Sequence, residues 1–346
     1  MTTLKDVARH SGCDVSTVSR VLNNRPCRVG EEVRGRIHET ALRLGYVPNR
    51  TASSLVSGRT RTIGLLVPNV FDGVFAEYIE ALDFELTGQG YALRPFICHN
   101  RPEKEDAALD SLLHNEIDAM IAMFYNDADI ARYEQIRRHG KPLIFRCPEA
   151  KMLETFDTVQ LDLSEGYRRL AGHLIDCGCH RIGLVGGGVA QSLSRNETDA
   201  SVEQFRCAFR DGGLPPPDAR NAVVCADSQE AAHAALLDRL RREPSCFDGV
   251  IVHNINKVFG ATRAIRDAGL AIPREMKVAT ISDLSLCRMA PEPLTVWAQP
   301  IPEICHALVE LTLERLRGPD APCRHITIHS ELRIRESTQP TSGKSI

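Results

Sequence analysis

The sequence predicts a small all-α helix-turn-helix module followed by a large two-lobed α/β domain built on two doubly wound parallel sheets. Three observations support this prediction. Short amphipathic helices separated by glycines fill the first 48 residues, buried strands alternate with helices after Arg61, and charge is unequally divided. Residues 1–61 hold eleven Lys or Arg and five Asp or Glu, a net charge of +6, whereas the remaining 31 bases and 40 acids give −9. The first part therefore attracts a polyanion.

The composition argues against several classes of protein. No apolar run approaches the roughly 18 residues that a membrane span requires, so the membrane is not an expected partner. The polar N-terminus lacks the features of a secretory signal, and the expected location is the cytoplasm. Twelve cysteines are scattered singly, as in proteins with reduced thiols. Cys177-Gly178-Cys179-His180 has no second pair at zinc spacing, so we expect neither a bound metal nor another cofactor.

The first helix is predicted from a capping motif. Thr3 and Asp6 have the spacing at which a hydroxyl and a carboxylate satisfy the exposed N–H groups of a first helical turn. Leu4 and Val7 fall on one apolar face, and Gly12 ends the helix after barely two turns. The pattern predicts a short helix followed by a glycine turn.

The second helix has two distinct faces. Asp14 can cap it, and Val18 and Val21 form its inward stripe. Because successive residues of a helix are rotated by about 100°, Ser16 and Arg20 point away from that stripe together. This outer face is available to a partner.

A third helix begins with Glu31 and Glu32 at its positive end, and it ends at Gly45. Ile37 and Ala41 are expected to face inward. Three short helices with a glycine turn between the first two are typical of a helix-turn-helix.

These residues resemble the lactose-repressor (LacI/GalR) family. The motifs that carry the resemblance are Thr3-Leu4-Lys5-Asp6-Val7-Ala8, Gly12, Ser16-Thr17-Val18-Ser19-Arg20-Val21-Leu22-Asn23 and Leu44-Gly45-Tyr46-Val47-Pro48-Asn49. The match is dense over residues 1–61 and looser to about residue 337. It implies a transcription regulator, expected to be a repressor, that binds a near-palindromic double-stranded operator as a homodimer.

Arg20 is the leading candidate for reading a base, because an outward arginine on a recognition helix can donate two hydrogen bonds to guanine. Val15 and Ser16 lie where the resembled family varies its choice of operator, and Val15 suits a thymine methyl. The residues expected to bind the DNA backbone are Thr3, Thr17, Ser19, Asn23, Asn49 and Arg50. The alternative to DNA binding is that these polar residues form an ordinary solvated helix face.

The segment 49–61 is a linker with the capacity to form a short helix. About two turns with several serines are too short to be stable alone, so such a helix needs a partner surface. The resemblance implies a hinge helix that orders in the minor groove, where Leu55 wedges between base pairs and Ala52 lies alongside. A disordered tether is the alternative.

After Arg61, apolar runs alternate with helical patterns in the manner of parallel sheets. We expect strands at 63–67, 92–98, 119–123, 143–145, 158–161, 181–185, 222–225, 249–252 and 277–281. Helices are expected near 74–88, 103–114, 129–139, 164–177, 201–211, 228–242 and 257–268. Gly186-Gly187-Gly188 matches no phosphate-loop or dinucleotide pattern, so a flexible loop is expected there.

By resemblance, the two halves form a periplasmic-binding-protein-like domain whose chain crosses between lobes three times. The expected divisions are a helix-turn-helix domain at 1–48, the linker at 49–61, an effector-binding and dimerisation domain at 62–338 and a disordered tail at 339–346. One lobe is expected at about 62–160 plus 291–322, and the other at about 161–290 plus 323–338.

A ligand crevice is expected where the carboxyl ends of the strands in the two lobes face each other. In sugar-sensing members of the resembled family, opposed acids and an arginine clamp hydroxyls, but this sequence departs from that pattern. Arg146 replaces an acid, Ser201 replaces an arginine, Asn254 is followed by Ile255 instead of an acid, and Ser282 interrupts the usual Phe-Asp-Asp.

Because arginine pairs with carboxylate and phosphate, we expect an anionic effector near Arg146, such as a sugar phosphate or sugar acid. A domain that has lost its small ligand is the alternative. Further candidates for the effector site, each equally explained as a polar loop residue, are Asn69, Phe71, Asp72, Tyr125, Asn254 and Asn256. Trp297 lies near a crossover and is expected either in the core or facing the cleft.

No nucleophile elbow or zinc-protease motif occurs, so the sequence does not indicate an enzyme. The competing class is a solute-binding or sugar-metabolising protein, which would show no salt-dependent binding to duplex DNA. The leucine-rich extension that forms tetramers in one branch of the family is missing after Glu336, which favours a dimer.

Overall fold

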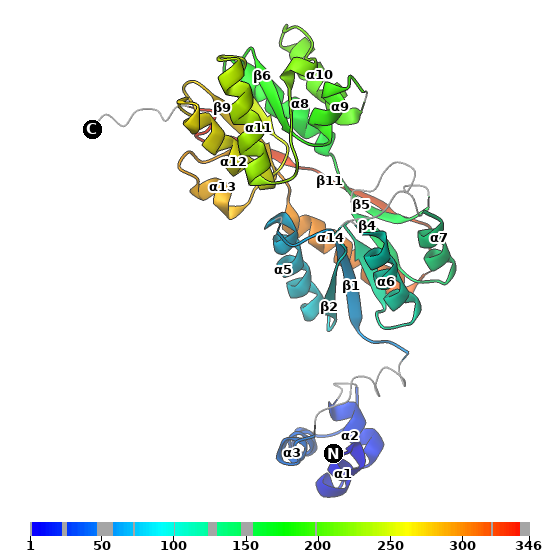
Figure 1. The fold of residues 1–346 in the computed structure, drawn as a ribbon. Coiled ribbons are helices and arrows are strands. Elements are labelled where there is room, and N and C mark those ends of the chain that lie inside the picture. Colours follow the sequence, from blue (N-terminus) through cyan, green and yellow to red (C-terminus); the bar gives the residue numbers. More distant parts are fainter. Residues whose placement is uncertain are drawn as a thin grey trace, which may run out of the picture.

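The computed structural model describes residues 2–22, 26–46, 58–71, 73–99, 101–123, 130–146, 155–197, 199–319 and 321–339. Three helices form the N-terminal module, as the sequence predicts: α1 (Leu4–Ser11), α2 (Val15–Leu22) and α3 (Glu31–Arg43). They pack around a small core in which Val7, Val18, Val21 and Ile37 are fully buried. Gly12 has a φ of 67°, a left-handed conformation that permits the sharp turn between α1 and α2. Figure 1 shows these helices as a body of their own.

The N-terminal lobe contains a six-stranded parallel sheet in the order β11-β5-β4-β3-β1-β2. Its strands are β1 (Thr62–Val67), β2 (Ala92–Ile97), β3 (Ala119–Ala122), β4 (Leu143–Arg146), β5 (Asp157–Leu161) and β11 (His325–Ile328). Its helices are α5 (Gly73–Gly88), α6 (Pro102–Leu113), α7 (Ile130–Arg138) and α14 (Ile301–Arg317). The inner strands are almost wholly buried, because helices cover both faces of such a sheet.

The C-terminal lobe contains a second six-stranded sheet in the order β12-β10-β9-β8-β6-β7. Its strands are β6 (Ile182–Gly186), β7 (Ala222–Val224), β8 (Gly249–Val252), β9 (Lys277–Ile281), β10 (Thr295–Ala298) and β12 (Glu331–Arg333), and only β12 pairs antiparallel. Its helices are α8 (Leu163–Asp176), α9 (Val189–Ser194), α10 (Ala200–Asp211), α11 (Gln229–Arg242), α12 (Ile255–Asp267), α13 (Ser285–Met289) and the 3₁₀ turn η3 (Ala219–Asn221).

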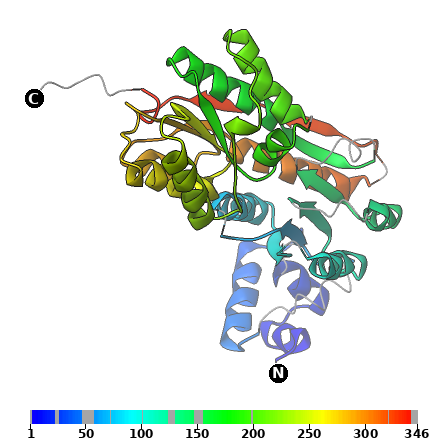
Figure 2. The same ribbon diagram turned by 45° about the horizontal axis from the view of Figure 1, so that its top comes forward.

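The strand pairing shows that two of the expected lobe boundaries are wrong. Val296 in β10 pairs with Thr280 in β9, so β10 belongs to the C-terminal lobe. Ile326 in β11 pairs with Val159 in β5, so β11 belongs to the N-terminal lobe, as Figure 2 shows by its place beside β5. The chain therefore crosses between β10 and α14 and again between β11 and β12. The reason is that these short strands are placed by hydrogen bonding to distant strands, which a local pattern does not encode.

Two further expectations are settled by burial and geometry. The loop expected at Gly186-Gly187-Gly188 is a short one, because Gly186 ends β6 and Gly187 and Gly188 form the turn that leads into α9. Trp297 lies in the core rather than facing the cleft, since it is 5% exposed within β10. A Cβ placed on Gly166 would lie 2.5 Å from its ring, so the glycine is required for this packing.

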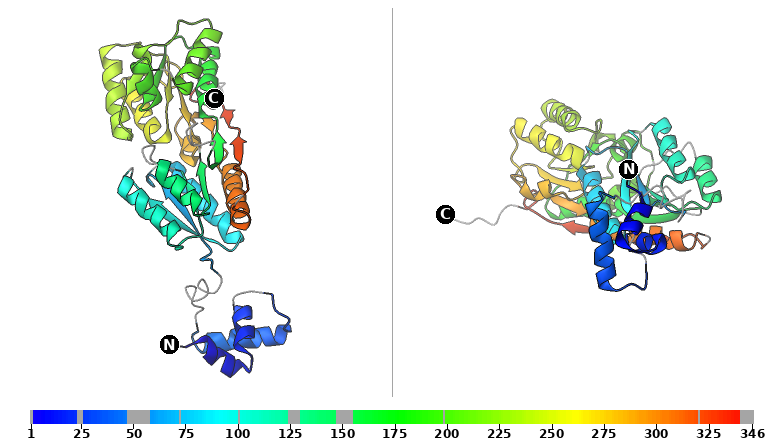
Figure 3. Two further views of the ribbon diagram at one scale, coloured as in Figure 1. Left: turned by 90° about the vertical axis from the view of Figure 1, so that its right-hand side faces the viewer. Right: turned by 90° about the horizontal axis from the view of Figure 1, so that it is seen from below.

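The two lobes pack directly against each other. One apolar cluster runs through both, with Val67 and Tyr78 from the N-terminal lobe and Val250 and Leu284 from the C-terminal lobe. At the start of α5, a Cβ placed on Gly73 would lie 2.5 Å from Cδ1 of Leu284. The left panel of Figure 3 shows the lobes stacked end to end.

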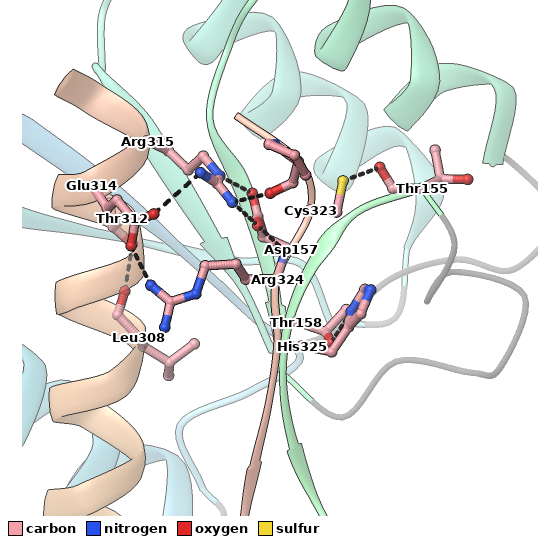
Figure 4. A network of polar contacts seen from close by, with 11 residues as sticks. Thr155, Asp157, Thr158, Leu308, Thr312, Glu314, Arg315, Cys323, Arg324 and His325 are labelled. Atoms are coloured by element: carbon pink, nitrogen blue, oxygen red, sulfur yellow. Dashed lines mark hydrogen bonds and ion pairs between the residues drawn. The ribbon is translucent and has the colours of Figure 1, made fainter. Parts of the chain in front are cut away.

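A buried ion pair fixes the connection from α14 to β11 within the N-terminal lobe. Arg315 donates to both carboxylate oxygens of Asp157, at 2.6 and 2.8 Å, and to the carbonyl oxygen of Pro322 at 2.7 Å. The backbone N–H of Arg324 donates to the same carboxylate at 2.8 Å, as Figure 4 shows. These bonds place β11 alongside β5. Among the described residues, no helix combines the length and the apolar character needed to cross a bilayer.

Candidate functional site

The outer face of α2 is a candidate nucleic-acid interface. Val18 and Val21 are fully buried in the module's core, which leaves the opposite side of the helix in solvent. Val15, Ser16 and Arg20 are all exposed on that side, Val15 by 41%. The three residues predicted to read bases therefore share one accessible surface.

The residues predicted to contact the DNA backbone lie in different environments. The Thr3 hydroxyl donates to Oδ2 of Asp6 at 2.7 Å and accepts from the Asp6 N–H at 3.4 Å. Hydrogen bonds from Thr3 also hold the pKa of Asp6 below its usual value. Thr17 and Ser19 are half-buried on α2. Asn23, Asn49, Arg50, Ala52 and Leu55, predicted to contact the backbone or the minor groove, lie outside the described residues.

The C-terminal end of the linker is attached to the N-terminal lobe. Asp118, directly before β3, accepts hydrogen bonds from the N–H groups of Thr60 at 2.7 Å and Arg61 at 2.8 Å. Arg59 donates to the carbonyl oxygen of Leu316 at 2.6 Å, in the last turn of α14. Carbonyls there have no partner within the helix and favour a cation. The lobe thus holds the segment that leads to the DNA-binding module.

At the junction of the lobes, Arg146 ends β4 and lies over the ring of Tyr78, 4.9 Å from its centroid. Its Nη2 donates to Oε1 of Gln299, which lies in the crossover between β10 and α14. Gln299 in turn donates from Nε2 to Oγ of Ser282 at 2.8 Å. Two predicted effector residues, one from each lobe, are therefore connected through Gln299.

Asn254 and Asn256 belong to a second polar cluster, beyond the carboxyl ends of β7 and β8. Asn254 donates to Oδ1 of Asp227 at 3.0 Å, and Asn256 bonds the same carboxylate. Lys257, whose side chain is 2% exposed, donates to Asp227 and to Asn254. Burial acts to raise the pKa of Asp227, but hydrogen bonds from Lys257 and Asn254 outweigh it and lower the pKa overall. The cluster thus contains an acid-base pair.

Tyr167 and His253 form a stacked pair beside this cluster. Their rings are 9° from parallel with centroids 6.2 Å apart, and the Tyr167 hydroxyl bonds Nδ1 of His253. Burial lowers the pKa of His253 to about 4, and the charge of nearby Lys257 acts in the same direction. Burial also raises the pKa of Tyr167. Both side chains are therefore neutral near pH 7, and a single shared proton joins the hydroxyl oxygen to Nδ1.

Three of the remaining predicted effector residues are described by the structure. Asn69 and Phe71 follow β1, and Phe71 is 88% exposed. Ser201 lies in the first turn of α10. Asp283, next to Ser282, accepts from Arg335 at 2.6 Å. Asp72 and Tyr125 lie outside the described residues.

Gln299 and Asp227 belong to these clusters but were not predicted from the sequence. Each follows the carboxyl end of a strand, β10 and β7 respectively, which is where doubly wound sheets place ligand-binding side chains. That position is the signal that would have identified both residues. In the part of the chain that the structure describes, no three His, Cys, Asp or Glu side chains are grouped to hold a metal ion.

Comparisons with known proteins cover nearly the whole chain. Residues 3–49 match the family model of bacterial regulatory proteins of the lacI family, and residues 171–338 match the periplasmic binding protein-like domain. The transcriptional regulator GalS of Salmonella typhimurium is 30% identical over 324 residues, which cover 92% of this chain and 91% of GalS. The transcriptional repressor CytR of Escherichia coli is 26% identical over 337 residues, which cover 97% of this chain and 96% of CytR.

The fold also matches that of a solved protein bound to DNA. The lac repressor dimer, in a crystal structure with operator and the anti-inducer ONPF, aligns with a TM-score of 0.80 at 20% sequence identity. The alignment covers 97% of this chain and 99% of that one.

Proposed function

The chain belongs to the lacI family of bacterial regulatory proteins, and from this membership we propose that it binds a near-palindromic operator as a homodimer. It is a transcription regulator with a helix-turn-helix DNA-binding module, and its relatives include repressors. The named relatives are regulators, and we propose that this chain likewise acts by binding rather than by catalysis. Its place of action is then the nucleoid, in the cytoplasm.

One observation supports base reading most directly. Arg20 is exposed on α2 opposite the buried Val18 and Val21, so the helix can enter the major groove without disturbing the module's core. Its guanidinium can donate to O6 and N7 of guanine, while Val15 and Ser16 contact neighbouring bases. The same module carries the excess of positive charge that attracts phosphate.

Gel-shift titrations with wild type, Arg20→Ala and Arg20→Lys test this role. Arg20→Ala should reduce the preference for the operator guanine by roughly 1–3 kcal/mol. Arg20→Lys retains the charge but loses the two-bond geometry, so specificity should fall while salt-dependent affinity for generic DNA remains. Unchanged specificity in both variants would remove Arg20 from this role.

For the backbone and the minor groove, the proposal follows the family pattern. Thr3, Thr17, Ser19, Asn23, Asn49 and Arg50 would bind the DNA backbone. Leu55 would enter a base step with Ala52 beside it. Leu55→Ser should then abolish DNA bending in a circular-permutation gel assay and leave the helix-turn-helix module folded. Normal bending by that variant would contradict the wedge.

The homodimer is supported by an exposed apolar surface on α5 and α13. Phe84 on α5 is 82% exposed, and Leu286 and Met289 on α13 are 58% and 77% exposed. The two helices are neighbours, because Glu77 of α5 accepts a hydrogen bond from the backbone of Ser285 at the start of α13. Figure 1 shows both helices on the same flank of the lobes. Large apolar side chains exposed on neighbouring helices are typical of interaction surfaces.

We propose that the effector is an anion and that Arg146 binds it. The guanidinium lies at the carboxyl end of a sheet and at the junction between lobes, where doubly wound proteins bind ligands. Arginine is suited to carboxylate and phosphate, because its planar guanidinium donates two parallel hydrogen bonds to them and balances their charge. A domain without a small ligand is the alternative, and it predicts that no anion stabilises the wild-type protein.

A further inference from the structure

The carbonyl oxygen of Gln299 occupies a position suited to an oxygen of a bound anion. Two donors converge on this one atom, the guanidinium of Arg146 and the hydroxyl of Tyr78, the latter at 3.2 Å. The donors come from different elements, β4 and α5, and Tyr78 is fully buried. We propose that Gln299 is an internal competitor for the anionic effector, holding the anion's place until the ligand displaces it. This inference rests on the proposed anionic effector of Arg146.

The chemistry of the donors fixes the orientation of the Gln299 amide. A guanidinium can only donate, so the atom that faces Arg146 is the carbonyl oxygen, and the NH₂ group points the other way. That NH₂ donates to Oγ of Ser282 at 2.8 Å. The side chain therefore accepts from the N-terminal lobe and donates to the C-terminal lobe.

An anion has an energetic advantage over the amide at this position. Arginine forms bidentate ion pairs with carboxylate and phosphate, in which two parallel hydrogen bonds add to the attraction of opposite charges. Gln299 presents a neutral oxygen to Arg146, whereas a phosphate or carboxylate presents a charged one. A ligand can therefore displace the amide, although it must compete with a tethered group that is always present.

Displacement of Gln299 would also remove a contact between the lobes. Ser282 lies directly after β9 with a φ of 80°, and its N–H donates to the carbonyl oxygen of Trp297 at 3.0 Å. Its hydroxyl is thus held at a defined point of the C-terminal lobe. When an anion takes the place of the Gln299 oxygen, the bonds that Gln299 accepts from Arg146 and Tyr78 of the N-terminal lobe are lost, and Ser282 is no longer connected to that lobe through Gln299. Anion binding would then change the preferred arrangement of the lobes, since the ligand favours one arrangement over the other.

Calorimetric titration of the full-length protein with inorganic phosphate, against chloride at equal ionic strength, tests the proposal. Gln299→Ala and the more nearly isosteric Gln299→Met remove the competing oxygen, and both should bind phosphate about tenfold more tightly than wild type. Gln299→Glu places a carboxylate on the two donors and should abolish phosphate binding. Arg146→Ala should also abolish it, and Gln89→Ala, an exposed glutamine after α5, should match wild type.

Several results would overturn the proposal. Equal phosphate affinity in wild type, Gln299→Ala and Gln299→Met would show that the amide does not compete. Weaker binding in those variants would make Gln299 a ligand contact instead. No phosphate binding by any variant would exclude an anion site at Arg146. Gel shifts with the same preparations separate this question from the regulator proposal, which fails only if wild type shows no sequence-specific DNA binding.

Discussion

Arg315 and Asp157 form a buried ion pair that joins the last turn of α14 to the first residue of β5. The Arg315 side chain is 3% exposed and the Asp157 side chain 10%. Hydrogen bonding to Asp157 raises the pKa of Arg315, so the guanidinium keeps its charge. Both carboxylate oxygens are used, and Figure 4 shows how the pair holds the connection from α14 to β11.

Asp157→Asn should destabilise the protein by about 3–5 kcal/mol, because it leaves the buried guanidinium without its counter-charge. Urea denaturation followed by circular dichroism measures the free energy of unfolding. Glu310→Gln is the control, since Glu310 lies on the same helix with a side chain that is 72% exposed. A loss no larger than that of the control would contradict a structural role for the pair.

Phe84→Glu should convert the proposed dimer into monomers. Truncating or charging a central apolar anchor of an interface commonly costs about 2–4 kcal/mol of association free energy. Sedimentation equilibrium gives the association constant, and gel shifts should show weaker operator binding because half-sites are then bound singly. Val224→Glu, at a site 46% exposed on the edge strand β7, is the control. If Phe84→Glu remained as dimeric as Val224→Glu, the α5 surface would not be the interface.

His253 should make the protein sensitive to acid. Its pKa is about 4 in the folded protein, against about 6.5 in an unfolded chain, so the unfolded state binds the proton first as pH falls. The contribution of neutral His253 to the free energy of unfolding is therefore fully present above pH ~6.5 and is lost progressively toward pH ~4. Melting temperatures measured across this range should fall less steeply for His253→Asn than for wild type. Parallel curves for the two proteins would show that His253 does not contribute to this loss.

The repeated βα units were predictable because a strand buried on both faces reads as a continuous apolar run. Residues 63–67 and 249–252 are such runs, and both become central strands, β1 and β8. By contrast, β11 and β12 span only His325–Ile328 and Glu331–Arg333, and their partly exposed side chains give no comparable signal. Their places depend on pairing with distant strands.

The candidate sites were predictable to the extent that one helix or one strand end defines them. Arg20 could be placed by helical periodicity, and Arg146 by its position at a strand end. Gln299 could not be identified from the sequence, because its role is to accept a hydrogen bond from Arg146, which lies far away in the sequence. The packing of α11 on α12 was not predictable either. A Cβ placed on Gly260 would lie 1.9 Å from the carbonyl oxygen of Gln229, so the packing requires a glycine for a contact with a residue distant in the sequence.

Selection of bound sites from a pool of random duplexes tests the central claim most directly. Full-length wild-type protein should enrich one near-palindromic site with a guanine in each half-site, and Arg20→Ala should enrich related sites without preference at that guanine. A folded, dimeric wild-type protein that enriched no sequence would contradict the account.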